Sequence, residues 1–264
     1  MINGYDRIRS TSKRLPIVLC LDVSQSMKQE YRIEQLNEVF RSFIIRLQDN
    51  RFASRAADIS IVTFGSNIIE EGRKFEPVFK VLDRTFEVVE NTECHLSEAI
   101  LHSIKLLENR LVLYDENDID CYYPYLVVIT GGDPDSTDLS DMREKAIQSI
   151  LKHCDSSRDE YDLLVPYIIG VGNDISSHCE VLNQMSSGFT GQAIQFDGDD
   201  RSLESLLDDM FNVMRMRVVS AYPSNYDMRK VYNAMKEQAC YHLQENQTDT
   251  SVLHNETNTS FVDE

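Results

Sequence analysis

The sequence predicts an α/β fold of three layers, in which a doubly wound, mostly parallel sheet with one antiparallel strand is flanked by helices. Short apolar runs of strand length alternate along the chain with longer segments whose apolar residues recur every three or four positions. This alternation is typical of βα units built around a parallel sheet. Gly, Ser or Asn residues follow several of the apolar runs, where the chain has to turn.

The first strand and helix are the clearest of these units. Residues 15–23 form a mostly apolar run that predicts a buried strand, and residues 30–47 predict the helix that follows it. In this second segment the apolar residues lie on one helical face. They are Ile33, Leu36, Val39, Phe40, Phe43, Ile44 and Leu47.

The next segments predict a β-hairpin and a second long helix. Residues 58–64 predict a strand, and the turn at 65–67 leads into residues 68–75, which we expect to pair antiparallel with that strand. Residues 77–89 favour neither helix nor strand. Residues 96–113 then repeat apolar residues at helical spacing and predict a helix.

The remaining segments bring the predicted sheet to five or six strands. Residues 125–130 predict a strand that ends at a glycine pair, and residues 139–151 predict a helix. Residues 163–171 predict another strand, in which Pro166 predicts a bulge or an irregular position because proline donates no ladder hydrogen bond. The last predicted elements are a helix at 175–185, a strand at 193–196 and a helix at 203–218.

These elements divide the chain into four parts. Residues 1–13 form an N-terminal extension, residues 14–220 one α/β domain, and residues 221–243 contain a candidate C-terminal helix. Residues 244–264 are rich in Asn, Thr and Ser and hold five acids without Lys or Arg. Such a composition predicts a disordered acidic tail.

Composition excludes some classes of partner. The chain has 44 acidic and 26 basic side chains and a formal charge of -18. Binding to nucleic acid or to an anionic membrane requires a surplus of Lys and Arg, so we expect neither. No apolar stretch approaches the roughly 20 residues of a membrane span, and no signal-peptide pattern opens the chain. We therefore expect a cytoplasmic protein.

A polar motif follows the first predicted strand. Asp22, Ser24 and Ser26 form the pattern DxSxS within residues 22–26. In an open α/β sheet, ligands bind beyond the carboxyl ends of the strands. A carboxylate and two hydroxyls at alternate positions of one loop can turn their oxygens toward one point, which suits a hard cation such as Mg²⁺.

The motif and its context resemble the von Willebrand factor A (vWA) domain. The runs LPIVLCLDVSQSM, ISIVTFGS, LVVITGGDPD and VPYIIGVG occur in that family's order within residues 14–220. The bacterial cytoplasmic subgroup similar to TerY of tellurite-resistance clusters is the nearest in character, because its chains also begin a few residues before an RLP strand. The resemblance implies the three-layer fold and a metal-ion-dependent adhesion site.

The resemblance also implies the ligands of that site, for Mg²⁺ or Mn²⁺. They are Asp22, Ser24, Ser26, Asp133 and Thr92. Cys94 and Gly131 stand where the family usually has a threonine and an aspartate, so Thr92 and Asp133 would have to reach the metal through a shift of their loops. A thiol is a soft ligand and a poor partner for Mg²⁺. The alternative is that DxSxS only caps the first helix and turns the chain, with docking retained and the metal lost.

We expect the loops at this end of the sheet to bind a protein partner. The residues assigned to partner contact are Gln25, Met27, His95 and Asp135. The resemblance implies an adaptor in bacterial stress or defence signalling, with a Ser/Thr kinase or a metal-dependent phosphatase as partner. We do not expect an enzyme, because a catalytic triad and a phosphate-binding loop are both missing. The alternatives are a metal-free structural subunit of a larger complex and a metal-dependent hydrolase that uses Asp22.

Overall fold

The computed structural model describes residues 13–131, 140–157, 163–172, 179–196, 208 and 232–240. These residues form a six-stranded sheet in the order β3-β2-β1-β4-β5-β6. The strands are β1 (Leu15–Asp22), β2 (Ala57–Phe64), β3 (Ile68–Pro77), β4 (Tyr125–Thr130), β5 (Val165–Val171) and β6 (Ile194–Phe196). Three predicted segments lie outside the described residues: the extension at 1–13 except for its residue 13, the helix at 203–218 except for its residue 208, and the tail at 244–264.

Five of the six strands run parallel, as the sequence predicts. β1 lies at the centre, with Leu15 opposite Ala57 of β2 and Ile17 opposite Tyr125 of β4. β3 pairs antiparallel with β2, with Phe64 opposite Ile68, which confirms the predicted hairpin. Because β1, β2, β4, β5 and β6 are parallel, their carboxyl ends meet at one edge of the sheet.

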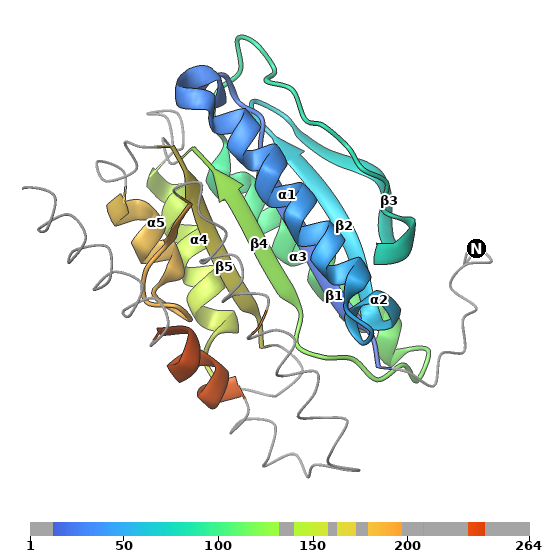
Figure 1. Ribbon diagram of the computed structural model, residues 1–264. Helices are drawn as coiled ribbons and strands as arrows, with labels where there is room; N and C mark the ends of the chain where they lie inside the picture. The colour runs from blue at the N-terminus through green and yellow to red at the C-terminus, as the bar shows by residue number, and fades with distance from the viewer. Residues whose placement is uncertain are drawn as a thin grey trace, which may run out of the picture.

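Helices cover both faces of the sheet and complete the three predicted layers. Figure 1 shows α1 in front of the sheet and α3 behind it. α4 packs beside α3, and α5 packs beside α4. The helices are α1 (Arg32–Asp49), α2 (Ala53–Ala56), α3 (Leu96–Asp115), α4 (Ser140–His153) and α5 (Cys179–Ser186), with 3-10 segments η1 (Gln25–Tyr31) and η2 (Val78–Lys80).

The first helix starts two residues later than predicted. Glu30 and Tyr31 have φ values of 50° and 59°, in the left-handed region that side chains other than glycine seldom adopt. They are the last two residues of η1, so that the loop after β1 makes a short 3-10 segment and a sharp bend before the helix begins at Arg32.

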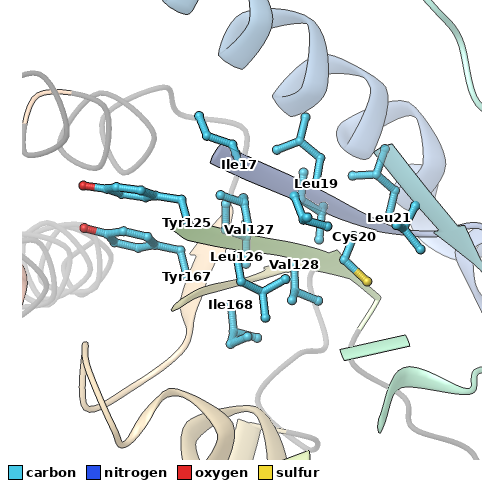
Figure 2. Packing of buried hydrophobic residues seen from close by; sticks show 14 of the residues in the cluster. Ile17, Leu19, Cys20, Leu21, Tyr125, Leu126, Val127, Val128, Tyr167 and Ile168 are labelled. Atoms are coloured by element: carbon cyan, nitrogen blue, oxygen red, sulfur yellow. The ribbon is translucent and has the colours of Figure 1, made fainter. Parts of the chain in front are cut away.

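The core lies on both faces of the central strands. All eight residues of β1 are buried. Figure 2 shows Ile17, Leu19 and Leu21 pointing to the α1 side of the sheet and Cys20 pointing to the other side. This alternation follows from the two-residue period of a strand, and it is why a buried parallel strand reads as a continuous apolar run.

The predicted irregularity at Pro166 is not present. Pro166 lies opposite Leu126 in an unbroken register between β4 and β5. On its other side β5 pairs with β6 only from Ile169 to Val171. Pro166 has no N–H to donate, but no ladder hydrogen bond is lost, because β6 does not extend to this position. Proline is tolerated at such an unpaired position.

Part of the candidate C-terminal helix packs against the domain. Residues 232–240 are helical, and Tyr232 is buried. Its hydroxyl donates to the carbonyl oxygen of Leu164 over 2.6 Å, and its ring lies 5.2 Å from that of Tyr123 and 5.5 Å from that of Phe189. This segment therefore covers the residues that lead into β4 and β5.

A buried ionic cluster lies at the opposite end of the sheet from the DxSxS loop. Asp58, near the amino end of β2, is 2% exposed. It pairs with Arg14 and with Arg110, whose Nη2 lies 3.1 Å from Oδ2, and it accepts a hydrogen bond of 2.5 Å from the hydroxyl of Tyr114. The cluster ties β1, β2 and α3 together where the strands begin.

Candidate functional site

Asp22 ends β1 and lies at the centre of a hydrogen-bond cluster. Its Oδ1 accepts from the backbone N–H of Ser24 over 2.9 Å. Its Oδ2 accepts from the hydroxyl of Thr130 over 2.8 Å and from the N–H of Gly131 over 3.4 Å. Asp22 is fully buried, so the protein supplies the hydrogen bonds that water would otherwise make.

Cys94 lies at this cluster, and Thr92 does not. The thiol of Cys94 is buried and donates to Oδ2 of Asp22 over 3.5 Å. The hydroxyl of Thr92 instead donates to the carbonyl oxygen of Val89 over 2.6 Å. The loop before α3 therefore presents a thiol to Asp22 where the family resemblance implies a hydroxyl.

The two serines of the motif are placed close together. The hydroxyl oxygens of Ser24 and Ser26 lie 2.9 Å apart. Two neighbouring ligands of an octahedral Mg²⁺, each at about 2.0–2.1 Å from the ion, are separated by roughly the same distance. This half of the implied metal site has a suitable spacing.

The other half of a metal site does not fit among the described residues. Gly131 carries no ligand, and a β-carbon there would lie 2.9 Å from Sδ of Met27 and 3.1 Å from Cδ of Arg32, so a carboxylate has no room. Within the described ranges, no group of three or more His, Cys, Asp or Glu side chains could hold a metal ion. Asp133 lies outside those ranges. The described side chains thus supply a serine pair but no complete cation site.

Burial sets the protonation of Asp22. Loss of solvent raises the pKa of its carboxyl above the ordinary aspartate value, and the hydrogen bonds from Ser24, Thr130 and Gly131 offset this only in part. Burial disfavours the charged form of a carboxyl, whereas hydrogen bonds to the carboxylate favour it. The carboxylate of Asp22 therefore accepts hydrogen bonds in a buried position where its negative charge is energetically unfavourable.

Arg32 is a site residue that the sequence reasoning missed. It is the first residue of α1, and its side chain is 5% exposed. A β-carbon at Gly131 would lie 3.3 Å from its Nη1, and one at Gly172 would lie 2.6 Å from its Nε. The arginine side chain therefore lies across the ends of β4 and β5. The glycines after these adjacent strands were the available signal, because they leave room for a long side chain.

Hydrogen bonds join the DxSxS loop to the loop before α3. The N–H of Val89 donates to the carbonyl oxygen of Val23 over 2.9 Å, and the N–H of Asn91 donates to the side-chain oxygen of Gln25 over 3.0 Å. Lys28 and Glu90 form an exposed ion pair of 2.9 Å. We call residues 24–31, 89–95 and 131 the carboxyl-end face.

The structure divides the four residues assigned to partner contact. Gln25 is exposed on the carboxyl-end face, and His95 is half-buried there, with ring nitrogens 3.4 Å from Glu93 and 3.6 Å from Glu98. Met27 is buried in the core, where a docked protein could not touch it without rearrangement, because the 3-10 turn directs it inward. Asp135 lies outside the described residues.

The strand order and the helices on both faces define a three-layer, doubly wound fold of the α/β class (Figure 1), as the sequence predicts. No family model and no curated protein matches the sequence. Among solved structures, a mutant of the PilB minor pilin from Streptococcus sanguinis is 11% identical with a TM-score of 0.52, over 82% of this chain and 65% of that chain. The pilus adhesin SpaC from Lactobacillus rhamnosus GG is 12% identical with a TM-score of 0.50, over 84% and 31%.

A third similar structure is the ArnB paralog VWA2 from Sulfolobus acidocaldarius, at 18% identity and a TM-score of 0.44, over 76% of this chain and 45% of that chain. This chain thus spans less than two thirds of the length of each of the three. At such identities the likeness to the two pilus proteins shows the fold alone. Among the described helices, none is both long and apolar enough to cross a membrane.

Proposed function

We propose that this protein is an interaction module that docks a partner protein on the carboxyl-end face. The observation that carries the proposal is Tyr31, whose side chain is 77% exposed although its backbone is held at φ 59°. Strained backbone of this kind is concentrated at functional sites, and tyrosine is enriched in protein interfaces. A large aromatic side chain held outward at the edge of the DxSxS loop is suited to partner contact.

The face is also preorganised for binding. The hydrogen bonds from Val89 to Val23 and from Asn91 to Gln25 hold its two long loops together, and Asp22 anchors them from below. A surface that is ordered before binding loses less conformational entropy when it docks. We propose binding rather than catalysis, because the carboxylate that a hydrolase would need, that of Asp22, is buried and engaged in hydrogen bonds.

Site-specific photo-crosslinking tests the docking face. A benzophenone amino acid at position 31 should crosslink one discrete protein in the cells that produce this chain. The matched control is position 112, because Val112 is 57% exposed on α3, close to Tyr114, which reaches the opposite end of the sheet. Adducts of the same protein from both positions, or no adduct from position 31, would overturn the proposal.

The identity of the crosslinked partner tests the finer function. We propose an adaptor role in the cytoplasm, in a bacterial stress or defence system, with a Ser/Thr kinase or a metal-dependent phosphatase as partner. The support for this role is the resemblance of the motifs to the TerY-like subgroup. Crosslinked peptides from a protein of neither class would overturn this part and leave the docking face in place.

Metal binding at this face is a separate proposal. Ser24 and Ser26 would hold Mg²⁺ or Mn²⁺, with Asp22 behind them and with Thr92 and Asp133 as the further ligands that the resemblance implies. Its support is the 2.9 Å spacing of the two hydroxyls. Isothermal titration with each ion should show binding to the wild type that is lost in S24A/S26A. Heats that do not differ between the two proteins would favour the metal-free subunit, which the positions of Cys94 and Gly131 support.

A further inference from the structure

Exposed apolar side chains gather on α1, α2 and the segment that follows β3. Phe79 and Leu82 are 60% and 71% exposed. Half of the eight large apolar side chains that are exposed among the described residues belong to two short stretches, 45–52 and 79–82. We call this group the α1–η2 patch, and its members are Ile45, Phe52, Phe79 and Leu82.

Gln48 joins α1 to the segment that follows β3. Its side-chain amide donates to the carbonyl oxygens of Val78 and Val81 over 2.9 and 3.1 Å. Ile45 lies one helical turn before Gln48 and therefore on the same side of α1. Leu82 follows Val81 directly. Two members of the patch thus lie beside the same hydrogen-bonded junction.

The two aromatic members lie where α1 ends. Phe52 is the N-cap residue of α2, and Phe79 belongs to η2. α2 contacts both α1 and η2, and Figure 1 shows α2 beside the C-terminal end of α1. Because β3 ends and β2 begins at this level, the patch lies at the amino ends of the parallel strands. The carboxyl-end face is at the opposite end of the sheet.

Basic side chains surround the patch although the chain as a whole is acidic. Residues 41–55 contain four Arg and one Asp, whereas the whole chain carries -18. Arg51 and Arg55 are exposed, and Arg55 lies three residues after Phe52, on the same side of α2. The ammonium group of Lys80 lies 5.8 Å from the ring of its neighbour in η2. The charge at the patch is therefore positive.

The nearby acids leave this positive charge in place. Asp83 is exposed and pairs with Arg41 over 3.3 Å. Within the part of the chain that the structure describes, neither Arg51 nor Arg55 forms an ion pair. Exposed apolar side chains bordered by polar residues mark interaction sites. The cations at this border give the patch a preference for an anionic partner.

We propose that the α1–η2 patch binds an acidic, amphipathic segment of a second partner protein. The apolar side chains of this segment lie on Phe79 and Leu82, and its carboxylates pair with Arg51 and Arg55, since the planar guanidinium matches the two oxygens of a carboxylate. This inference goes beyond the proposed docking on the carboxyl-end face and does not depend on it. Two docking surfaces at opposite ends of the sheet let one chain hold two proteins at once.

The net charge favours a protein segment over an anionic membrane. Basic residues beside exposed apolar side chains could serve either partner. At physiological ionic strength charges are screened beyond about 8 Å, so a short segment responds to the charge of the patch alone. A membrane faces a whole side of the molecule and is repelled by the total charge of -18.

The methyl resonances of Ile45 and Leu82 test this inference on the full chain by nuclear magnetic resonance. The probe is a short synthetic peptide that alternates Glu and Leu, and two comparison peptides carry Lys in place of Glu or Ser in place of Leu. We expect saturable shifts with the acidic peptide alone. The methyl groups of Val112, which is 57% exposed on α3, should not shift. Equal shifts with the lysine peptide, or none with the acidic peptide, would overturn the proposal.

Two pairs of variants separate the apolar and the ionic parts of recognition. Leu82→Ser has Val112→Ser as its matched control, and R51Q/R55Q has Lys145→Gln, because Lys145 is exposed on α4. All of these side chains are exposed, so thermal unfolding should be unchanged. Affinity for the acidic peptide should fall several-fold in L82S and in R51Q/R55Q and stay constant in both controls. An unchanged affinity in R51Q/R55Q would overturn the acidic class of partner.

Photo-crosslinking from position 79 identifies the occupant in cells. A benzophenone amino acid there should crosslink a segment of another protein in which Asp or Glu residues adjoin apolar ones, and R51Q/R55Q should weaken this crosslink. Adducts with lipid, with a basic segment, with a second copy of this chain or with its own residues 244–264 would overturn the proposal. A crosslink from position 79 without one from position 31 removes the docking function of the carboxyl-end face alone, and the reverse removes this inference alone.

Discussion

The thiol of Cys94 donates to Oδ2 of Asp22 across 3.5 Å, although 72 residues separate them in the chain. Thr130 donates to the same oxygen over 2.8 Å. A soft thiol and a strand-end hydroxyl thus share the carboxylate around which the DxSxS loop is built. The chemistry of the site depends on which donor faces Asp22 from the loop before α3.

Replacing this thiol by a hydroxyl should strengthen cation binding. In Cys94→Thr an oxygen takes the place of the sulfur, and oxygen is the ligand that Mg²⁺ prefers. We expect affinity for Mg²⁺ and Mn²⁺ to rise about tenfold, or about 1.4 kcal/mol. Isothermal titration measures it, and Cys94→Ala is the control because it removes the thiol without adding an oxygen. Equal binding by the two variants would show that no metal approaches this loop.

The buried carboxyl of Asp22 should make stability depend on pH. Because burial raises its pKa, the folded protein holds this proton more tightly than the unfolded chain does. This contribution to stability is therefore complete below the ordinary aspartate pKa of about 3.9 and is lost as pH rises through the higher folded value. Asp22→Asn removes the titrating group.

Urea unfolding of wild type and D22N in EDTA measures this dependence. The free energy of unfolding of the wild type should fall relative to that of D22N as pH rises from about 4 toward neutrality. The remaining acids titrate in both proteins, so the difference isolates Asp22. A wild type that gains stability relative to D22N over this range would show that the hydrogen bonds from Ser24, Thr130 and Gly131 outweigh burial.

The ionic cluster at the amino ends of the strands should dominate the polar part of stability. Asp58→Ala leaves Arg14 and Arg110 without their shared carboxylate in a largely buried place. Removing one member of a buried ion pair costs about 3–5 kcal/mol. The control is Asp83→Ala, since the pair of Asp83 with Arg41 is exposed and should contribute about 1 kcal/mol or less. The free energy of unfolding of each variant is measured by urea unfolding. Similar losses in both variants would show that the buried cluster contributes no more to stability than an exposed ion pair does.

The sequence predicts the strands and their order along the chain well, because the burial of a strand determines its local composition. β1, β2 and β4 are buried at every position, and each appears as a mostly apolar run. The antiparallel β3 also follows from its short turn after β2. Parallel strands joined by helices then leave few possible topologies.

The donors around Asp22 depend on pairing between distant strands, which a sequence pattern does not show. Cys20 lies opposite Val128 in the register of β1 and β4, so Asp22 is brought beside Thr130, a residue that the sequence reasoning passed over. Cys94 reaches Asp22 from a third segment. Knowledge of the register would have identified Thr130.

The sequence did not identify Arg32 as a site residue for a different reason. A charged residue at the start of a predicted helix is normally exposed, and only the ends of β4 and β5 determine that this one is buried. The left-handed backbone of Glu30 and Tyr31, which turns α1 into that position, has no glycine to mark it. Burial of this arginine is therefore a tertiary property.

The two glycines under Arg32 should respond differently to alanine. At Gly131 the added methyl meets Met27 and Arg32 on an ordinary backbone, so Gly131→Ala should cost about 1–3 kcal/mol through overpacking. At Gly172 the methyl meets Nε of Arg32 at 2.6 Å, and the backbone is also held at φ 110°. Gly172→Ala should therefore cost more, with backbone strain of about 1–3 kcal/mol in addition.

Double-mutant cycles with Arg32→Ala separate the steric cost from the backbone cost. Truncating Arg32 makes room for the methyl at both positions, so Gly131→Ala should lose most of its effect in that background. Gly172→Ala should keep the part that comes from its positive φ, because an L side chain is strained there whatever the space. Urea unfolding of the four proteins in each cycle gives the coupling energies. Additive effects of both glycine variants with Arg32→Ala would mean that the arginine does not lie over β4 and β5 in solution.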